Sequence, residues 1–463
     1  MKTPASRYTG YSVYTNMPVG GEMRGFGAPP ASYALALHMD KCAEAVGMDP
    51  IEFMRKNWKS PGDVEKQEGV PDVTIGPNAQ DDCVRLGAEA IGWAKRTPPE
   101  AKSGRIRRGI GMYTGAQHSG RADSDGLIWL DRQGRLHLPL GTGNIGCAAH
   151  TGIAGVAAEA LGVELDAIDV TWADSDNVAW TFVTDASRSS NCDGKAVYNA
   201  AQDLINQLKT HAAGMLDIPA EDLTMREGRI EGPDGTGLDL PAIAAAAPKR
   251  TEFAPYYDAE ADQSPMLNES TGKIDQHPPM TVKPATQALA QALQDKGGIV
   301  GLGHYVWNPS TQAWGASFAE VEVDMETGQV RVLKFVSAHD VGRILYRTGA
   351  EAQIHGGGIM GLGYGLTEGL MVDPNSLVPL NPGYLGLQPM TALDYPEITP
   401  ILLEAPSDGG PYGAKGFGEN PMLGGAPAIA NAIYNATGVR MDEIPLTWER
   451  VHDNLRRAGK LMV

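Results

Sequence analysis

Residues 126–139 read GLIWLDRQGRLHLP, and they decide the fold class of this chain. Two short apolar runs, Gly126–Asp131 and Arg135–Pro139, have the composition of strands, and the polar Asp131–Gly134 between them is typical of a hairpin turn. Beyond this hairpin, segments typical of helix, strand and helix follow one another, at His150–Leu161, Leu165–Trp172 and Lys195–Leu208. This alternation predicts a mixed α/β fold.

A second region further along the chain repeats this pattern. Ala316–Val323 and Gln329–Ala338 alternate apolar residues as strands do, and the small-residue segment Ala350–Leu370 follows as a helix. Residues 231–300 are rich in Pro, Asp and Gln, which indicates a surface insertion. We therefore expect two related α/β lobes with an insertion between them, at residues 1–230, 301–463 and 231–300, respectively. Further helices are expected at Ala31–Ala45, Pro50–Trp58, Asn78–Arg96, Pro427–Ala436 and Asp442–Arg457.

Composition and charge exclude several classes of function. The chain has 463 residues and a formal net charge of −18 at pH 7, a balance that does not suit the phosphates of nucleic acid. No apolar run approaches the length of a membrane span, and the first residues lack the apolar region of a signal peptide. The four cysteines are widely spaced and form no CxxC pair, which argues against a disulfide framework or an iron–sulfur cluster. We expect a cytoplasmic protein.

The clearest candidate for chemistry is Glu419, within Gly413–Pro421 (GAKGFGENP). A carboxylate set between glycines and a proline in apolar surroundings is costly to bury without a function, so Glu419 is a candidate general base. The alternative is that Glu419 only caps the helix expected near Pro427.

Three further loops could bind a ligand. Gly20–Gly27 (GGEMRGFG) places an arginine among glycines, which suits an anionic or hydrogen-bonding ligand, although an ordinary surface loop is an equal alternative. Gly141–Cys147 (GTGNIGC) precedes a helix and could aim backbone N–H groups at phosphate, but it is not a dinucleotide fingerprint. Thr184–Ser190 (TDASRSS) could also bind phosphate, or could simply cap a helix.

These loops occur in a recognisable order with other segments. The order is RGFGAP (24–29), the glycine turn (141–147), TDASRSS (184–190), AEVEVDMETGQVRV (319–332), AHDVGR (338–343), GLGYGLTEG (361–369) and GAKGFGENP (413–421). From about Tyr11 to the C-terminus, this order resembles the C-terminal, molybdopterin-binding half of the large subunit in the xanthine oxidase (molybdenum hydroxylase) family.

The resemblance implies a role for single residues. Glu419 stands where the family keeps its catalytic base, and Phe26, Met112 and Tyr113 stand where related enzymes face their substrate. The implied cofactor-binding residues are Met23, Arg24, Gly25, Gly146, Cys147, Thr184, Ala186, Ser187, Arg188, Ser189 and Lys415. The sulfurs of the pterin would hold molybdenum, so no side chain is expected as a direct metal ligand.

The chain departs from the family pattern at three positions. Cys147 and Met360 stand where the family usually has glutamine, and His355 replaces a glutamate. The first two changes remove amides near the expected cofactor, which leaves the substrate class and the type of reaction open.

The resemblance also implies cofactors and partners. We expect a molybdopterin-type molybdenum cofactor in its cytosine dinucleotide form, with [2Fe-2S] clusters on an iron–sulfur subunit and FAD on a flavin subunit. The chain contains no GGGFGGK-like loop, so a second molybdopterin-binding subunit is expected to supply the N-terminal half in a split arrangement.

The implied activity is hydroxylation of an electron-poor carbon of a small molecule (an N-heterocycle, an aromatic compound or an aldehyde), with water as the oxygen source. Two alternatives stay open. One is a molybdenum-dependent hydratase that adds water to a conjugated double bond, and the other is a non-catalytic scaffold subunit.

Overall fold

The computed structural model describes residues 2–3, 7, 9–18, 20–66, 72–250, 266–268, 273–275 and 282–462. Its helices are α1 (Ala28–Ala45), α2 (Pro50–Asn57), α3 (Gln80–Ile91), α4 (Ala149–Leu161), α5 (Gly194–Leu216), α6 (Leu240–Ala246), α7 (Pro284–Lys296), α8 (Arg347–Leu366), α9 (Tyr384–Leu387), α10 (Asn420–Leu423), α11 (Gly425–Thr437) and α12 (Trp448–Arg457). Its strands are β1 (Val64–Glu65), β2 (Val73–Thr74), β3 (Ile106–His118), β4 (Asp123–Leu130), β5 (Leu136–Pro139), β6 (Ile168–Thr171), β7 (Thr224–Arg226), β8 (Arg229–Glu231), β9 (Gly237–Asp239), β10 (Met266–Asn268), β11 (Lys273–Asp275), β12 (Ile299–Val306), β13 (Gln312–Asp324), β14 (Val330–Asp340) and β15 (Glu397–Leu403).

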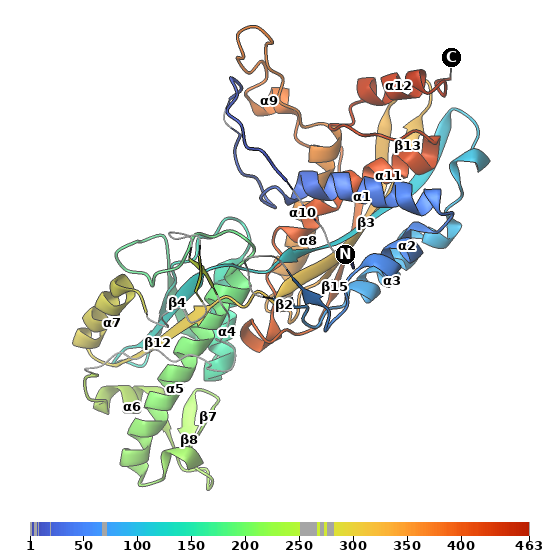
Figure 1. Cartoon of the computed structure of the whole chain (residues 1–463). Coiled ribbons are helices and arrows are strands. Elements are labelled where there is room, and N and C mark those ends of the chain that lie inside the picture. Colours follow the sequence, from blue (N-terminus) through green and yellow to red (C-terminus); the bar gives the residue numbers. More distant parts are fainter. Residues whose placement is uncertain are drawn as a thin grey trace.

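Two four-stranded sheets with the same topology organise the molecule (Figure 1). In the sheet of the first lobe, the hairpin β4–β5 leads through α4 to β6, which lies parallel to β5. In the sheet of the second lobe, the hairpin β13–β14 leads through α8 to β15, which lies parallel to β14. The expected fold class, two related α/β lobes, is confirmed.

Each lobe contributes one strand to the sheet of the other lobe. β3 directly precedes β4 in the sequence but pairs antiparallel with β13 in the second lobe. β12 directly precedes β13 but pairs antiparallel with β4 in the first lobe. The sheets are therefore interleaved, and they do not divide at residues 230 and 300 as the sequence suggested. An apolar run predicts that a strand forms, but tertiary contacts choose its partner.

The hairpin at residues 126–139 forms as expected. Asp131 Oδ1 accepts hydrogen bonds from the backbone N–H groups of Gln133 (2.9 Å) and Arg135 (2.9 Å). Gly134 has a φ of 85°, a left-handed conformation that glycine adopts without a steric penalty. The turn therefore fixes the register of β4 against β5.

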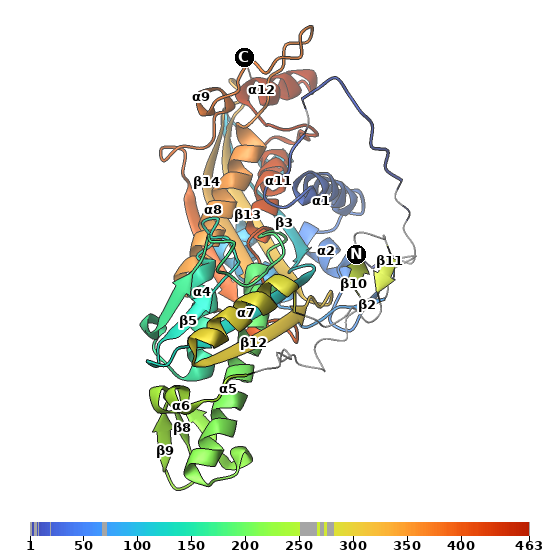
Figure 2. The same ribbon diagram turned by 90° about the vertical axis from the view of Figure 1, so that its left-hand side faces the viewer.

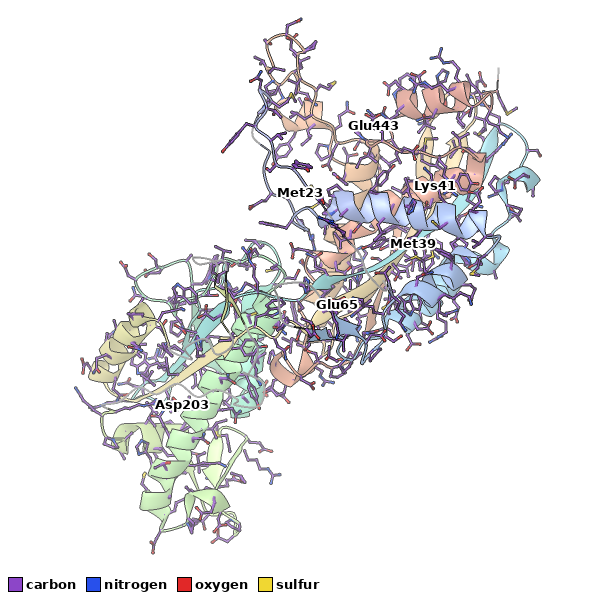
Figure 3. All side chains as sticks on the ribbon, viewed as in Figure 1. Met23, Met39, Lys41, Glu65, Asp203 and Glu443 are labelled. Atoms are coloured by element: carbon purple, nitrogen blue, oxygen red, sulfur yellow. The ribbon has the colours of Figure 1, made fainter. Side chains whose placement is uncertain are left out.

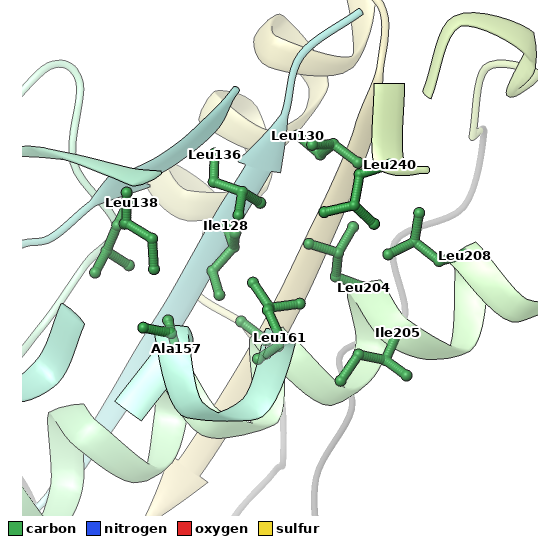
Figure 4. Close-up of a cluster of buried hydrophobic side chains, with 14 of the residues drawn as sticks. Ile128, Leu130, Leu136, Leu138, Ala157, Leu161, Leu204, Ile205, Leu208 and Leu240 are labelled. Atoms are coloured by element: carbon green, nitrogen blue, oxygen red, sulfur yellow. The ribbon is translucent and has the colours of Figure 1, made fainter. Parts of the chain in front are cut away.

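The sheet of the first lobe is buried on both faces. Ile128 points toward α4 and α5, where it joins a cluster that includes Leu161 and Leu204 (Figure 4). Its neighbour Leu127 belongs to a second cluster, on the opposite face beneath α7. Asp203 ties α5 to β12, because its carboxylate accepts a hydrogen bond from the N–H of Leu302 (2.9 Å) (Figure 3).

Part of the expected surface insertion lies in this core. Ile243 of α6 and Leu293 of α7 are buried, each in one of these two clusters. The expectation of a surface insertion is therefore wrong for these two helices, since their alanine-rich sequences give only a weak apolar periodicity. Residues 251–265, 269–272 and 276–281 of the expected insertion lie outside the described residues.

The sheet of the second lobe lies between α3 and α11. Phe318 packs with Val84 of α3 on one face, and Val321 packs with Ile433 of α11 on the other. A Cβ atom at Gly111 of β3 would lie 2.2 Å from the backbone nitrogen of Ala432, so glycine permits the close approach of α11.

Two views at right angles show the first lobe extending away from the second, with α5 reaching toward the small sheet that contains β8 (Figures 1 and 2). In the part of the chain that the structure describes, no helix combines the length and the apolar character needed to cross a membrane.

Candidate functional site

The four candidate loops meet at one cavity of about 910 Å³, whose walls come from both lobes. Met23 is one of its lining residues and lies in the segment that leads into α1 (Figure 3). The sequence-predicted residues that line this cavity are Met23, Arg24, Phe26, Gly146, Cys147, Thr184, Ser187, Arg188, Ser189, Lys415 and Glu419. Residues as far apart in the sequence as Arg24 and Gly418, 394 positions, are thus brought to a single site.

Glu419 is held by two hydrogen-bond donors. The backbone N–H of Gly25 donates to Oε1 (3.1 Å), and the hydroxyl of Ser187 donates to Oε2 (2.8 Å). The same hydroxyl oxygen accepts a hydrogen bond from the N–H of Glu419 (2.9 Å). Because that contact occupies a lone pair of Oγ, the hydroxyl hydrogen is left for the carboxylate. The arrangement orients the carboxyl group of Glu419 in the cavity wall.

Backbone geometry explains why these residues meet. Ala186 (φ 44°) and Ser187 (φ 54°) both lie in the left-handed region, which is strained for residues that carry a Cβ atom. The carbonyl of Ser187 packs against Gly416, where a Cβ atom would lie only 1.6 Å from its oxygen. Gly416 therefore allows the Glu419 loop to approach the strained segment.

Arg24 joins the N-terminal loop to the Glu419 loop. Its Nε donates to the carbonyl of Gly418 (2.5 Å), and its Nη2 donates to Oε1 of Gln353 on α8 (2.9 Å). Burial lowers the pKa of the Arg24 guanidinium, and the negative charge of Glu419 opposes that effect. Arg24 is thus a cation at the base of the cavity that is already bonded to protein.

Two predicted cofactor contacts are instead bonded deep within the protein. The fully buried guanidinium of Arg188 donates to Asp193 (2.9 Å) and to the Ser124 hydroxyl (2.7 Å). The ammonium of Lys415 donates to Asp340 (2.7 Å), and burial lowers the pKa of that lysine. Both cations bind buried groups of the protein, and these bonds hold the loops of the cavity wall in place.

Two helices begin at the cavity, beside the loops that were expected to bind a ligand. α4 begins at Ala149 and α8 begins at Arg347, each without a side-chain cap, and the first turns of both line the cavity. Uncapped N–H groups at a helix N-terminus attract anions such as phosphate. The donors present therefore fit a flat ligand that carries phosphate.

Several residues of the cavity were not predicted from the sequence, among them Arg121, Phe182 and Gln353. The guanidinium of Arg121 lies 5.7 Å from the ring centre of Phe26 and 5.0 Å from that of Phe182. Gln353 donates to the carbonyl of Gly146 (3.4 Å) and accepts from Arg24, so it places an amide beside Cys147. In the sequence, Gln353 stands one helical turn before Gly356 and two turns before Met360. This spacing, which puts the three residues on one face of a helix, was the only sign that Gln353 would line the cavity.

Met112 and Tyr113 do not face the cavity. Met112 packs in the core between β3 and α3, and Tyr113 is buried with its hydroxyl 3.1 Å from that of Ser32. The expected substrate-facing role of these two residues is corrected here, because alternate positions of a strand point to opposite faces and neither face of β3 opens into the cavity at this point. Gly25 and Ala186 contribute through their backbones.

Among the residues that the structure describes, no group of three or more His, Cys, Asp or Glu side chains lies close enough together to hold a metal ion.

Comparison with known proteins gives a consistent set of similarities. Residues 86–396 match the model of a family described as molybdopterin cofactor-binding domain, and residues 2–58 match a second model of the same description. The chain is 29% identical to the xanthine dehydrogenase molybdenum-binding subunit of Escherichia coli O157:H7, over 98% of this chain and 56% of that protein. It is 28% identical to the aldehyde oxidoreductase molybdenum-binding subunit of Escherichia coli (strain K12), over 97% of this chain and 54% of that protein.

Solved structures show the same fold. The crystal structure of quinoline 2-oxidoreductase from Pseudomonas putida 86 superposes with a TM-score of 0.75 at 22% sequence identity, over 94% of this chain and 52% of that chain. The chain spans about half the length of the curated relatives that it matches.

Proposed function

This chain belongs to the molybdopterin cofactor-binding domains of the xanthine oxidase family, and from that premise we propose that it forms the catalytic, molybdenum-binding part of a multi-subunit hydroxylase. The observation that carries the proposal is the placement of Glu419, which lines the cavity with each carboxylate oxygen bound by one donor. A carboxylate fixed in this way can accept a proton from a molecule bound in the cavity.

The cavity offers a defined set of contacts to the cofactor. The N–H groups at the starts of α4 and α8 would bind its phosphates, while Thr184 and Ser189 add hydroxyls to the wall. We extend the proposal to the cytosine dinucleotide form, because two uncapped helix N-termini can receive more than one phosphate. Gly146 and Cys147 would lie along its edge.

The bound molybdenum centre supplies the two-electron oxidation, and the protein supplies the proton acceptor and the orientation of the substrate. Glu419 would take up the proton released when water becomes the nucleophile, because Ser187 and Gly25 hold both of its oxygens in place as acceptors. Phe26, half exposed in the cavity wall, offers a ring face against which a flat substrate can stack. We propose an electron-poor carbon of an N-heterocycle, aromatic compound or aldehyde as the position attacked.

Electrons must then leave the site, so we propose the partners that such chemistry needs. These are an iron–sulfur subunit with [2Fe-2S] clusters, a flavin subunit with FAD, and a second molybdopterin-binding subunit that completes the cavity. The names of the similar proteins, which are molybdenum-binding subunits, support an assembly of this kind.

A hydratase is the second candidate, and one observation favours it. Cys147 and Met360 line the cavity at positions where the family has amides. Groups around a metal tune its potential and the acidity of bound water, so these changes could shift the site away from oxidation. Gln353 partly restores an amide beside Cys147, which favours the hydroxylase.

The test is turnover in ¹⁸O-labelled water with an artificial electron acceptor, using the purified native assembly, together with its content of molybdenum, iron and flavin. The hydroxylase predicts labelled product and two electrons transferred to the acceptor for each product molecule. Labelled product without reduction of the acceptor would establish the hydratase instead. Absence of molybdenum from an otherwise intact assembly would contradict both and leave a scaffold role.

A further inference from the structure

Arg121 is a cation of the cavity wall that lies beside the half-exposed ring of Phe26. Arg24 and Lys415 are bonded to groups at the base of the cavity and behind it. The side chain of Arg121 instead projects into the wall, 5.7 Å above the ring of Phe26, and keeps about a third of its surface exposed. A guanidinium placed beside a half-exposed aromatic ring can meet a ligand that approaches that ring.

A series of contacts connects Arg121 with Glu419. Arg121 pairs with Asp185 (2.5 Å), which stands two residues before Ser187, and Ser187 donates to Glu419. On the other side, Glu419 accepts from the residue that directly precedes Phe26, and Phe26 lies under Arg121. The guanidinium of Arg121 and the carboxylate of Glu419 therefore belong to the same part of the cavity wall.

The backbone fixes the direction of this side chain. Gly120 (φ 115°) and Ala122 (φ 56°) flank Arg121 in conformations that turn the chain sharply on both sides. The carbonyl of Arg121 accepts a hydrogen bond from Nε of the buried Arg188 (3.2 Å). The loop is thus anchored at its backbone, while the side chain faces the cavity.

We propose that Arg121 recognises the carboxylate of a flat aromatic or heteroaromatic acid whose ring lies on Phe26. The inference rests on the proposed function and names its substrate class. A planar guanidinium binds a carboxylate through two parallel hydrogen bonds, which also sets the orientation of the attached ring. Asp185 holds Arg121 in position before the substrate arrives, and it competes with the substrate carboxylate for the same cation.

Binding of two probes tests the proposal without turnover. Benzoate and benzamide have the same ring and size, and they differ in charge. In the native assembly we expect benzoate to bind about tenfold to a hundredfold more tightly, as measured by calorimetry, because a charge-assisted hydrogen bond contributes that much. Arg121→Gln should abolish the preference, and Arg343→Gln, which removes another cation of the same cavity, should keep it.

Asp185→Asn separates recognition from a purely structural ion pair. If Arg121 binds the ligand, loss of the competing carboxylate strengthens benzoate binding and leaves benzamide unchanged. If the pair only supports the loop, benzoate gains nothing, and the proposal is overturned. The double variant Arg121→Gln with Asp185→Asn removes both charges of this ion pair, so it reports on recognition even if Arg121→Gln alone does not fold.

The two proposals fail in distinguishable ways. Molybdenum-dependent turnover of neutral rings, combined with equal affinity for benzoate and benzamide, would overturn the role of Arg121 and leave the proposed function intact. A benzoate preference that Arg121→Gln removes, in an assembly without molybdenum-dependent turnover, would support the binding role and contradict the proposed function.

Discussion

Ser187 determines the position of the proposed base through one hydroxyl group. The hydroxyl accepts a hydrogen bond from the N–H of Glu419 and donates to its carboxylate, so backbone and side chain are fixed together. The only other donor to the carboxylate among the described residues is the N–H of Gly25. Removal of the hydroxyl would leave the carboxylate of Glu419 held by the N–H of Gly25 alone.

Ser187→Ala should therefore lower turnover by about tenfold to a hundredfold, the equivalent of a lost hydrogen bond to a charged group. The molybdenum content should stay at the wild-type level, since the helix N-termini that we propose to bind the phosphates are unchanged. Ser190→Ala, which removes a hydroxyl from the same cavity wall, is the matched control. Equal turnover in the two variants would show that Ser187 does not position the base.

The buried histidine of the second lobe gives a pH-dependent stability. Burial and the nearby charge of Arg24 lower the pKa of His339 from 6.5 to about 3. Between these values the unfolded chain binds a proton that the folded chain does not, so the folded state loses stability as the pH falls. The loss from this group should approach about 1.4 kcal/mol per pH unit.

Urea unfolding of the wild type and of His339→Gln, each at pH 4.5 and pH 7, measures this contribution. The variant should lose less stability than the wild type on acidification. Identical losses would mean that His339 is not the group that titrates.

At the level of elements, the approach of two loops sets the geometry of the site. Gly416 must lack a side chain, because a Cβ atom there would lie 1.6 Å from the carbonyl oxygen of Ser187. Two residues on, a Cβ atom at Gly418 would meet nothing closer than 3.6 Å, which is ordinary van der Waals contact. The chain thus offers a matched pair of glycines in one loop.

Gly416→Ala should destabilise the protein by about 1–3 kcal/mol, the usual effect of overpacking, and should displace Glu419. Gly418→Ala should be close to neutral. Thermal unfolding and turnover measured on both variants give the comparison. An equal response from the two would show that the contact between the loops is not what fixes the site.

The sequence predicted elements better than it predicted their partners. The strand and turn composition of residues 126–139 was enough to locate the β4–β5 hairpin, because both strands and the turn are local. The expected division at residue 230 placed β3 in the first lobe, but its partner β13 lies about 200 residues away, in the second. In the site, Glu419 stood out by its glycine surroundings. Arg121 did not, because its role depends on Phe26 and Asp185, which come from other loops.

On the scale of the whole molecule, the exchange of β3 and β12 joins the two lobes into one cooperative unit. Each sheet would lose an outer strand if the other lobe unfolded. The cavity lies where the lobes meet, so the site depends on both. Independent unfolding of either lobe is therefore not expected.

Leu204→Ala tests this coupling. Leu204 is fully buried in the first lobe, and its truncation should cost about 2–5 kcal/mol. Hydrogen exchange should show the most protected amides of β13, in the second lobe, losing protection together with those of β4. Loss confined to the first lobe would mean that the lobes unfold separately.

The central claim is that Glu419 is the base of a molybdenum-dependent reaction. Its most direct test is turnover of Glu419→Gln in the native assembly at molybdenum content equal to that of the wild type. Because glutamine keeps the size of the side chain and removes the proton acceptor, turnover should fall by about a hundredfold to ten-thousandfold. A variant that holds molybdenum and turns over at the wild-type rate would contradict the claim and reduce Glu419 to the cap of α10.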